Sequence, residues 1–582
     1  MTDATLLQFA QVNDAAAATT KKLQKQAALA AYFRELADDG DLRLAVRFAA
    51  GRAFPATAER VLNVGGAVMT DAILAHVALT PDELHKQYIA SGEIGEAMAA
   101  VWEARRRTPP PPADRPPITL RDLARHFDDI AKLGKRENKL AALVELLAPV
   151  RTAREAAYAG KIIFGDLRTG VQEGVLQAAV AEAFGLTTAQ VQRCQLLVGD
   201  LDEVAVLARH GRTGEAAFRL FHPIQFMLAT PRETAADLAG DLAGRPFFAE
   251  DKLDGIRAQV HKTGDGFAAR VAIYTRTMDR TDDAFPDVVE QVRQVPGDFL
   301  LDGEIVPYAG GQVLPFGQLQ KRLGRKNPPP KVIREHPCAF VAFDVLYANG
   351  RLAMDEPLSV RRQLLEDLCG GNVPQTTLVH VTTEPEITSA FAAARERRNE
   401  GIILKDPASL YSPGRRGQMW FKLKTHLPTL DCVVTAAETG HGKRRNHLSD
   451  YTFAVWDREP AEEGAALVNI GKAFSGVTDE EIEQLTKLFT ELTVSQFGRV
   501  RQVKPQVVLE IACDQIQLSA RHASGYALRF PRIKRVRWDK RPEDADRLAR
   551  VAEVYESSPN FAKPTAAPVP AAAPEPTLFD GM

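Results

Sequence analysis

The sequence predicts a multidomain chain with a helical N-terminal part, an α+β central part, a small β-barrel and a disordered tail. Three observations indicate this organisation: the length of 582 residues, a change from helical to β-rich patterning near Phe221, and a Pro- and Ala-rich end after Tyr555. At about 150 residues per domain, this length corresponds to roughly three or four domains. A single compact unit is therefore not expected.

Helical periodicity dominates the N-terminal part, which we assign to residues 1–217. Apolar residues recur at spacings of three and four in 27–36 and 176–184, and strand signals are scarce. Prolines at 109–112 and 116–117 interrupt the pattern, and Thr119 has the features of an N-cap for the helix that follows. We interpret the prolines as a loop within one helical domain; a boundary between two helical lobes is the alternative.

Two β-rich parts follow. Residues 218–428 hold short apolar runs at 268–274, 299–306 and 339–346 separated by helical stretches, which predicts an α+β domain. Residues 429–556 hold runs at 431–436, 451–456 and 507–511 and one predicted helix at 479–492. About five short strands with one helix suit a small barrel of the oligonucleotide-binding (OB) type. Residues 557–582 are rich in Pro and Ala and are expected to form a flexible tail.

Composition restricts the function classes. The net charge is −2 and the pI about 6.7, so any nucleic-acid contact must come from local basic surfaces. Five cysteines lie far apart without a C-x-x-C pair, which excludes a zinc knuckle and a disulfide framework and indicates a reducing cytoplasm. No secretory signal or membrane span is recognisable, since Gln177 and Glu182 interrupt the apolar stretch 175–186. We expect a soluble intracellular protein.

Five short segments carry the chemistry, in the order KLDGIR (252–257), DGE (302–304), FD (343–344), EG (400–401) and KLK (422–424). They supply an amine nucleophile, carboxylates, an aromatic face and lysines for phosphates. This combination predicts attack on a nucleoside triphosphate. Lys252 is the proposed nucleophile, and its neutral amine would attack the α-phosphorus of ATP. Because a free lysine is protonated at neutral pH, we expect burial beside Lys422, Lys424, Arg257 and a divalent cation to lower its pKa.

The five segments resemble the motifs shared by DNA ligases, RNA ligases and messenger-RNA capping enzymes. The string YSPGRRGQMWFKLK (411–424) is similar to that of bacterial and archaeal ATP-dependent DNA ligases. The helical segment 160–176 resembles the DNA-binding domain of three-domain ligases of this kind, in which backbone amides and basic side chains at helix ends bind phosphates. The resemblance implies an all-α DNA-binding domain, an α+β adenylation (nucleotidyltransferase) domain and an OB-fold domain.

The resemblance also implies roles for individual residues. Lys252 would become adenylylated, with ATP as the AMP donor and Mg²⁺ or Mn²⁺ as the cation. Glu304 would bind a ribose hydroxyl and, with Glu400, the metal ion. In DGE, Gly303 would permit a tight turn. The remaining nucleotide contacts comprise adenine (Glu250, Phe343), ribose and phosphate (Arg257, Arg276), the α-phosphate (Arg416, Lys422, Lys424) and pyrophosphate (Arg537, Lys540).

The expected activity is the sealing of 3′-OH/5′-phosphate nicks in duplex DNA through lysine-AMP and an adenylylated 5′-phosphate, in DNA repair. An NAD-dependent ligase is disfavoured because the four-cysteine zinc site of that class is absent from the sequence. An RNA-acting nucleotidyltransferase, either an RNA ligase or a capping-type guanylyltransferase, is the alternative. A catalytically inert DNA-binding module would require a broken motif, and none is visible.

Partners and location complete the expectations. The resemblance implies a monomer that acts on nicked double-stranded DNA, without a membrane, in the nucleoid of a bacterial cytoplasm. Leu578 and Phe579 place two large apolar residues in the Pro/Ala-rich tail. This string resembles the Leu-Phe peptides that dock into the sliding clamp, although the glutamine that opens such peptides is missing. A chance apolar pair is the alternative.

Overall fold

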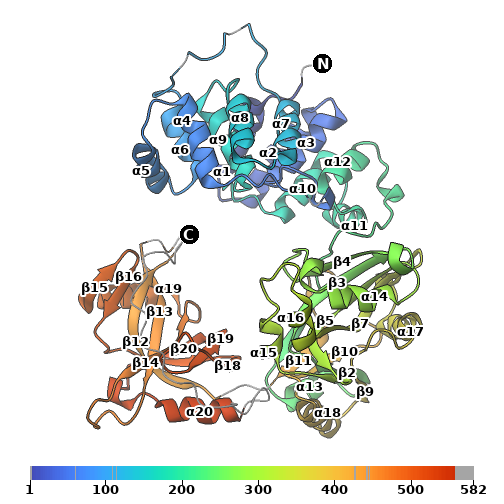
Figure 1. Ribbon diagram of the computed structural model, residues 1–582. Coiled ribbons are helices and arrows are strands. Elements are labelled where there is room, and N and C mark those ends of the chain that lie inside the picture. The colour runs from blue at the N-terminus through green and yellow to red at the C-terminus, as the bar shows by residue number, and fades with distance from the viewer. Residues whose placement is uncertain are drawn as a thin grey trace. The chain divides into compact units, whose positions relative to one another are not determined.

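The computed structural model describes residues 3–58, 60–107, 109–112, 114–424, 428–440, 444 and 446–557. The chain divides into two compact units, Met1–Ile224 and Gln225–Met582 (Figure 1). Leu578 and Phe579, with the rest of the expected tail after residue 557, lie outside the described residues. In the part that is described, no helix combines the length and the apolar character that crossing a membrane requires.

The first unit is built from helices around one apolar core. Thr119 caps α7 with its hydroxyl and forms a capping box with Asp122, which confirms the predicted N-cap. The proline-rich segment lies inside this one unit. The helices are α1 (Leu6–Ala17), α2 (Lys22–Glu35), α3 (Asp39–Ala49), α4 (Gly66–His76), α5 (Pro81–Ser91), α6 (Ile94–Trp102), α7 (Leu120–Lys132), α8 (Arg136–Leu147), α9 (Ala153–Phe164), α10 (Glu173–Ala183), α11 (Thr188–Val198) and α12 (Leu201–Arg209).

Two loops of the first unit meet closely. Gly51 follows α3 and Gly165 follows α9, both with positive φ, and a Cβ added at Gly51 would lie 2.9 Å from the Gly165 carbonyl oxygen. Lys25 stabilises the second loop, because its buried ammonium donates a hydrogen bond of 2.5 Å to the Thr169 carbonyl oxygen. The loops carry the exposed Arg52 and Arg168. We call residues 51–55 and 165–171 the paired loops.

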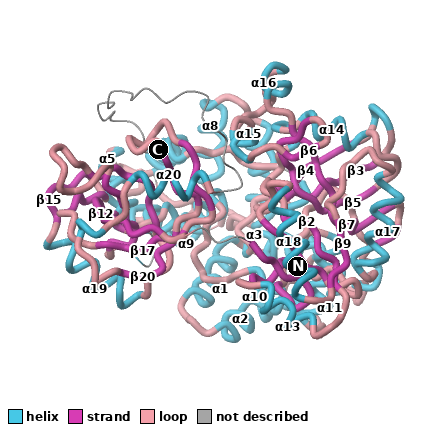
Figure 2. Tube along the Cα trace, turned by 90° about the horizontal axis from the view of Figure 1, so that it is seen from below, coloured by secondary structure: helices cyan, strands magenta, loops and turns pink. Residues whose placement is uncertain are grey.

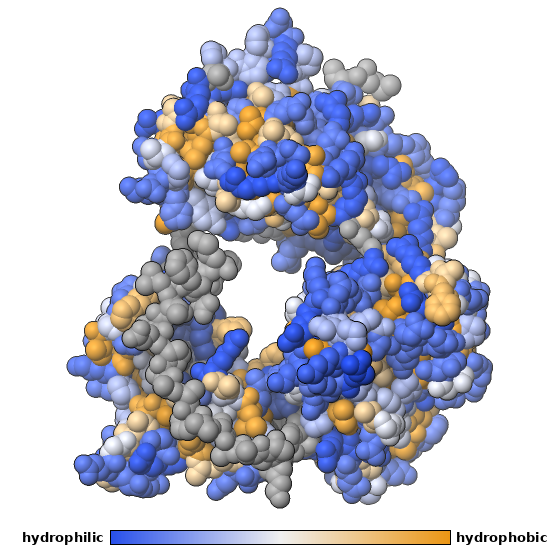
Figure 3. All heavy atoms as spheres, viewed as in Figure 1, coloured by the Kyte–Doolittle hydropathy of each residue, from blue (hydrophilic) through white to orange (hydrophobic). Residues whose placement is uncertain are grey.

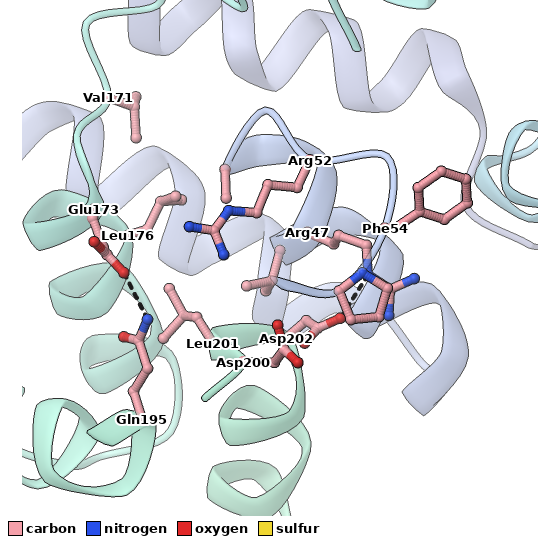
Figure 4. Close-up of a pocket in the computed structure, with 13 residues that line it drawn as sticks. Arg47, Arg52, Phe54, Val171, Glu173, Leu176, Gln195, Asp200, Leu201 and Asp202 are labelled. Atoms are coloured by element: carbon pink, nitrogen blue, oxygen red, sulfur yellow. Dashed lines mark hydrogen bonds and ion pairs between the residues drawn. The ribbon is translucent and has the colours of Figure 1, made fainter. Parts of the chain in front are cut away.

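A pocket opens beside the paired loops, between α3 and α10 to α12. Figure 4 shows Arg52 extending into it, with Glu173 bonded to Gln195 at 2.7 Å on one wall. On the other wall, the Asp200 carboxylate accepts a hydrogen bond of 2.6 Å from the Ala56 amide and one of 2.5 Å from the Thr57 hydroxyl. Asp200 therefore anchors the residues that follow the first of the paired loops.

Strands begin only in the second unit: among the described residues, β1 (Leu228–Arg232) is the first. Figure 2 colours the strands magenta and the helices cyan. One sheet has the order β1-β11-β10-β2-β9, and a second has the order β4-β3-β5-β7-β8 with β6 on β5. The further strands are β2 (Phe247–Lys252), β3 (Ile256–Thr263), β4 (Arg270–Thr275), β5 (Phe299–Ala309), β6 (Gln312–Val313), β7 (Cys338–Ala348), β8 (Arg351–Leu352), β9 (Leu378–Val381), β10 (Gly401–Lys405) and β11 (Arg416–Lys424).

Helices cover the outer faces of these two sheets. In the first sheet α18 packs on β10, β2 and β9, and in the second α14 and α17 pack on β7. The predicted strand at 268–274 starts later than expected, because residues 266–268 form a 3₁₀ turn. The helices are α13 (Ala235–Leu242), α14 (Pro286–Arg293), α15 (Phe316–Gln320), α16 (Pro330–Glu335), α17 (Leu358–Cys369) and α18 (Glu384–Glu396).

The C-terminal part holds more strands than the sequence predicted. Instead of about five, the described residues form nine, and a second helix follows them. The three runs named from the sequence correspond to β12, β13 and β17, whereas short strands such as β15, β16 and β18 are largely polar or exposed and form no apolar run. The elements are β12 (Leu430–Thr439), β13 (Leu448–Trp456), β14 (Leu467–Ala473), α19 (Asp479–Glu491), β15 (Thr493–Phe497), β16 (Val500–Val503), β17 (Val508–Ala512), β18 (Gln515–Leu518), β19 (Tyr526–Arg529), β20 (Arg532–Val536) and α20 (Leu548–Glu556).

The β domain is organised around β12, which pairs with β13, β16 and β17. Its apolar core lies inside, whereas hydrophilic residues cover most of the visible face of each unit in Figure 3. Phe474, Phe497, Phe530 and Trp538 are large apolar side chains that this domain leaves mostly exposed.

A buried ion pair stiffens the central part. Arg361 on α17 donates to both carboxylate oxygens of Asp344 on β7, at 2.7 and 2.9 Å, and both side chains are fully buried. The same guanidinium also donates to the Ser409 carbonyl oxygen at 2.9 Å. The pair therefore ties the helix, the strand next to Phe343 and the loop before β11 together.

We predict that Arg361→Met lowers the free energy of unfolding of the central domain by about 3–5 kcal/mol, because it strands a buried carboxylate. Scanning calorimetry of the full chain should show one transition lowered by roughly 10 °C. The exposed pair of Arg351 with Glu356 is the matched control. Its variant Arg351→Met should cost less than about 1 kcal/mol. Equal shifts for the two variants would contradict this account.

Candidate active site

The register of one sheet brings three of the five motif segments side by side. Gly401, the first residue of β10, pairs with Lys252 at the end of β2 and with Lys424 at the end of β11. A Cβ at Gly401 would clash with the Leu423 carbonyl oxygen and come within 3.0 Å of the Lys424 Cα. The close approach of β10 and β11 therefore requires glycine here.

Lys252 is bound to Glu400. The Lys252 amine contacts a carboxylate oxygen of Glu400, and the Glu400 amide donates to the Lys252 carbonyl oxygen at 2.8 Å. Burial by itself lowers the pKa of Lys252, but the charge and hydrogen bond of Glu400, helped by Glu304 and Asp254, raise it above its ordinary value. The pKa of Lys252 is therefore raised and not lowered by these side chains, because the carboxylates outweigh burial; the expectation of a lowered pKa also included a divalent cation, whose charge would act in the opposite direction.

Two further carboxylates face this pair. Burial raises the pKa of Glu304 to about 8, with the charges of Glu400 and Asp254 acting in the same direction. Burial and the charge of Glu400 raise the pKa of Asp254 to about 6. Crowding of negative charge in a buried site is relieved by a cation.

The carboxylates near Lys252 suit a divalent cation that is held jointly by the protein and a nucleotide. No group of three or more His, Cys, Asp or Glu side chains within the described ranges is arranged to hold a metal by itself. Mg²⁺ is commonly bound by one or two carboxylates together with substrate phosphates, and carboxylate oxygens are hard ligands. Glu304 and Glu400 therefore fit a cation that arrives with a nucleotide.

Cations also gather near Lys252, around Lys422. Burial lowers the pKa of the Lys422 ammonium, and the charges of Lys252, Lys424, Arg416 and Arg276 lower it further. Within the described part of the chain, Lys422 has no ion-pair or hydrogen-bond partner for its side chain. A cluster of cations around an unpaired lysine suits the binding of phosphates.

Arg257 is oriented by a buried carboxylate. It donates to both oxygens of Asp302 at 3.1 and 2.7 Å, and Tyr411 donates its hydroxyl to the same carboxylate at 2.7 Å. The prediction of a tight turn at Gly303 is wrong. Gly303 lies in the middle of β5, where a side chain would strike the Phe340 ring and the Val341 carbonyl oxygen.

Glu250 and Phe343 lie on the two facing sheets, in β2 and β7. Glu250 is 2% exposed, and the Phe343 ring is also buried. Lys405 links them, since its ammonium is 2.9 Å from a Glu250 oxygen and 4.5 Å from the centroid of the Phe343 ring.

Arg537 and Lys540 are not brought to Lys252. Both bind Asp431 of β12, at 3.0 and 2.5 Å, so their contacts stay within the C-terminal domain. Two other residues of that domain reach the site: Asp514 lies 2.8 Å from Lys424, and Arg529 lies 3.3 Å from Asp254.

Sequence reasoning missed several of these contacts. Asp514 and Arg529 follow from tertiary pairing and have no local signature. Thr376, which donates to Glu250 at 2.7 Å, lies in an irregular segment before β9. Lys405 did carry a signal, because it ends the apolar run 402–404 with a charge that must be buried if the strand is central.

A buried lysine amine with carboxylates and phosphate-binding cations around it defines the class of covalent nucleotidyltransferases. Comparisons with known proteins agree. Family models match for the DNA ligase N terminus at 5–181, the ATP dependent DNA ligase domain at 226–424 and the ATP dependent DNA ligase C terminal region at 444–540.

Relatives cover nearly the full chain. A probable DNA ligase of Koribacter versatilis is 40% identical over 574 residues, covering 94% of this chain and 96% of that protein. A DNA ligase of Archaeoglobus fulgidus is 32% identical, covering 94% and 98%. The chain belongs to the family of ATP-dependent DNA ligases. The solved structure Pmar-Lig_Pre. shares the fold at a TM-score of 0.57 and 16% identity, covering 91% of this chain and 99% of that one.

The Lys252–Glu400 contact predicts how Lys252 titrates. Glu400→Gln should lower the pKa of Lys252, because it removes the main group that raises it. Labelling of Lys252 by an amine-reactive reagent, quantified by peptide mass spectrometry across pH, should reach half its maximal rate at lower pH than in the wild type.

Glu304→Gln is the control, because Glu304 contributes less to the pKa of Lys252 than Glu400 does. Its titration midpoint should move less. A midpoint that is unchanged in Glu400→Gln would show that the carboxylate does not hold the ammonium form.

Proposed function

We propose that this ligase seals 3′-OH/5′-phosphate nicks in duplex DNA, with Lys252 as the nucleophile. The Lys252 amine attacks the α-phosphorus of ATP, the bond to pyrophosphate breaks, and lysine-AMP forms. AMP then passes to the 5′-phosphate of the nick, and the 3′-hydroxyl attacks that phosphate and releases AMP. The observation that carries this proposal is the register that places Lys252, Gly401 and Lys424 side by side, with Glu400 on the amine.

The first step requires a neutral amine. Glu400 touches the Lys252 ammonium and is the group placed to accept its proton before attack. Mg²⁺ or Mn²⁺ bound by Glu304 and Glu400 together with the nucleotide would offset the negative charge of the phosphates. Lys422, Lys424 and Arg416 would neutralise the α-phosphate as negative charge builds on it.

The remaining site residues hold the nucleotide. Glu304 on β5 would accept from a ribose hydroxyl, and Arg257, fixed by Asp302, would contact the ribose from the neighbouring strand. Arg276 lies near enough to Lys422 to lower its pKa, which suits a phosphate contact. Phe343 would stack on adenine, and Glu250 would accept from it.

Arg537 and Lys540 require a rearrangement to act on pyrophosphate, because Asp431 holds both in this structure. We propose that the triphosphate competes with Asp431 for these cations during lysine adenylylation. Arg529 and Asp514 would then lose their contacts with Asp254 and Lys424, since the same domain carries all four residues.

We assign residues 1–217 to DNA binding, 218–428 to adenylation and 429–556 to an OB-type domain. The paired loops support the first assignment, because they present the exposed cations Arg52 and Arg168 close to one another in the chain's first unit. We propose a monomer that acts on DNA in the nucleoid of a bacterial cytoplasm, in repair. Docking of Leu578 and Phe579 into a sliding clamp is a further proposal, supported by the sequence alone.

We predict that Lys252→Ala abolishes transfer of labelled AMP to the protein, because among the described residues no other lysine amine is in contact with Glu400. Lys252→Arg, which keeps the charge but is not a nucleophile at neutral pH, is the control and should also be inactive. Both variants should bind nicked DNA as the wild type does. Label retained in either variant would refute the assignment, and wild-type labelling by GTP in place of ATP would favour a guanylyltransferase.

We also predict that replacing Arg52 and Arg168 together by Ala weakens binding to a nicked duplex and leaves lysine-AMP formation intact. Each lost phosphate contact should reduce the slope of log K against log salt by about one. Fluorescence anisotropy over a salt series measures this slope. Arg125→Ala on α7, another exposed arginine of the first unit, is the control. If the double variant and the control have equal slopes of log K against log salt, the paired loops do not belong to the DNA-binding surface.

A further inference from the structure

The Glu250 carboxylate has one satisfied and one unsatisfied oxygen. Oε2 accepts from the Thr376 hydroxyl at 2.7 Å and from the Lys405 ammonium at 2.9 Å. Oε1 is buried and has no hydrogen-bond partner within the described residues. A buried carboxylate oxygen without a donor is costly, so its persistence indicates that a ligand supplies the missing donor.

Lys405 and Thr376 fix the direction of this free oxygen. Lys405 is 1% exposed, and its ammonium lies 4.5 Å from the ring centroids of both Phe343 and Trp420. Trp420 is itself held by a hydrogen bond of 3.1 Å to the Ser409 hydroxyl. Thr376 is tied to β7, because its amide donates to the Ala342 carbonyl oxygen at 3.2 Å. Neither donor to Oε2 is therefore free to swing to Oε1.

We propose that Lys405 and Thr376 are positioning residues that set the nucleobase selectivity of the ligase through Glu250. This inference rests on the proposed function. With Oε2 occupied by both donors, Oε1 can only accept, and it suits the exocyclic amino group of adenine. Guanine presents a carbonyl oxygen at the same ring position, and two acceptors facing each other in a buried site repel.

The test compares ATP with purine riboside triphosphate, which lacks only the amino group. In the wild type, kcat/KM for lysine-AMP formation should be about 10- to 100-fold higher with ATP, the value of a hydrogen bond to a buried charge. Lys405→Met should reduce this ratio to less than about threefold, and Lys405→Arg should restore most of it. In a Glu250→Gln background, Lys405→Met should change the ratio no further.

Lys262→Met is the matched control. Lys262 is another fully buried lysine of the central domain, but it donates to the Gly264 and Gly297 carbonyl oxygens at the far end of β3. Its variant should slow both nucleotides equally, as a structural role predicts. If Lys405→Met does not fold, Thr376→Val provides the test. This variant removes one hydrogen-bond donor and no charge, and it should lower the same ratio of kcat/KM with ATP to kcat/KM with purine riboside triphosphate.

Two results would overturn the inference. A Lys405→Met or Thr376→Val protein that loses activity with both nucleotides in equal proportion shows that the residue only supports the fold. A wild type that forms no lysine-AMP with any nucleotide overturns the proposed function and this inference with it. A lower ratio of kcat/KM with ATP to kcat/KM with purine riboside triphosphate in these variants supports the inference. This result does not depend on whether the variants seal DNA.

Discussion

The pairing of β10 with both β2 and β11 is the constraint on which the site depends. Hydrogen bonds of a sheet fix residues across strands at close, defined spacing. Gly401 can occupy the central strand only because it has no side chain, and so Lys252 and Lys424 come to lie on either side of it. Glu400, one residue earlier, then reaches the Lys252 amine. Chemistry spread over about 170 residues of sequence is brought together by backbone geometry.

Charges of both signs gather around Lys252, and only some of them are paired. Three carboxylates, Asp254, Glu304 and Glu400, form one cluster, and burial raises the pKa values of Asp254 and Glu304. Cations form the other cluster and lower the pKa of Lys422. Each cluster is unfavourable alone, because like charges repel in a poorly solvated site. A metal-bound nucleotide would bring a cation for one cluster and phosphates for the other, so both clusters are complementary to the same ligand.

Buried ion pairs around the site hold its side chains in single orientations. Arg257 with Asp302, Arg361 with Asp344, and Lys405 with Glu250 each join residues far apart in the sequence. Replacing such pairs by apolar residues is often neutral for stability, so stability alone does not account for them. In each case one partner lies next to a residue assigned to the nucleotide. Orientation of the site is the role that the three pairs share.

The sequence by itself determined the order of the motifs, the helical and β-rich parts, and the cap at Thr119, because local patterning and short motifs depend on neighbouring residues only. It also pointed to Lys252, Glu400 and Lys424, which the structure brings together, but not to the contacts made by Asp514, Arg529, Thr376 and Lys405. The tertiary structure decided how they act: Glu400 raises the pKa of Lys252, Gly303 serves close packing instead of a turn, and Asp431 holds Arg537. These outcomes depend on strand register and on burial, which arise from contacts between distant segments and leave no pattern along the chain.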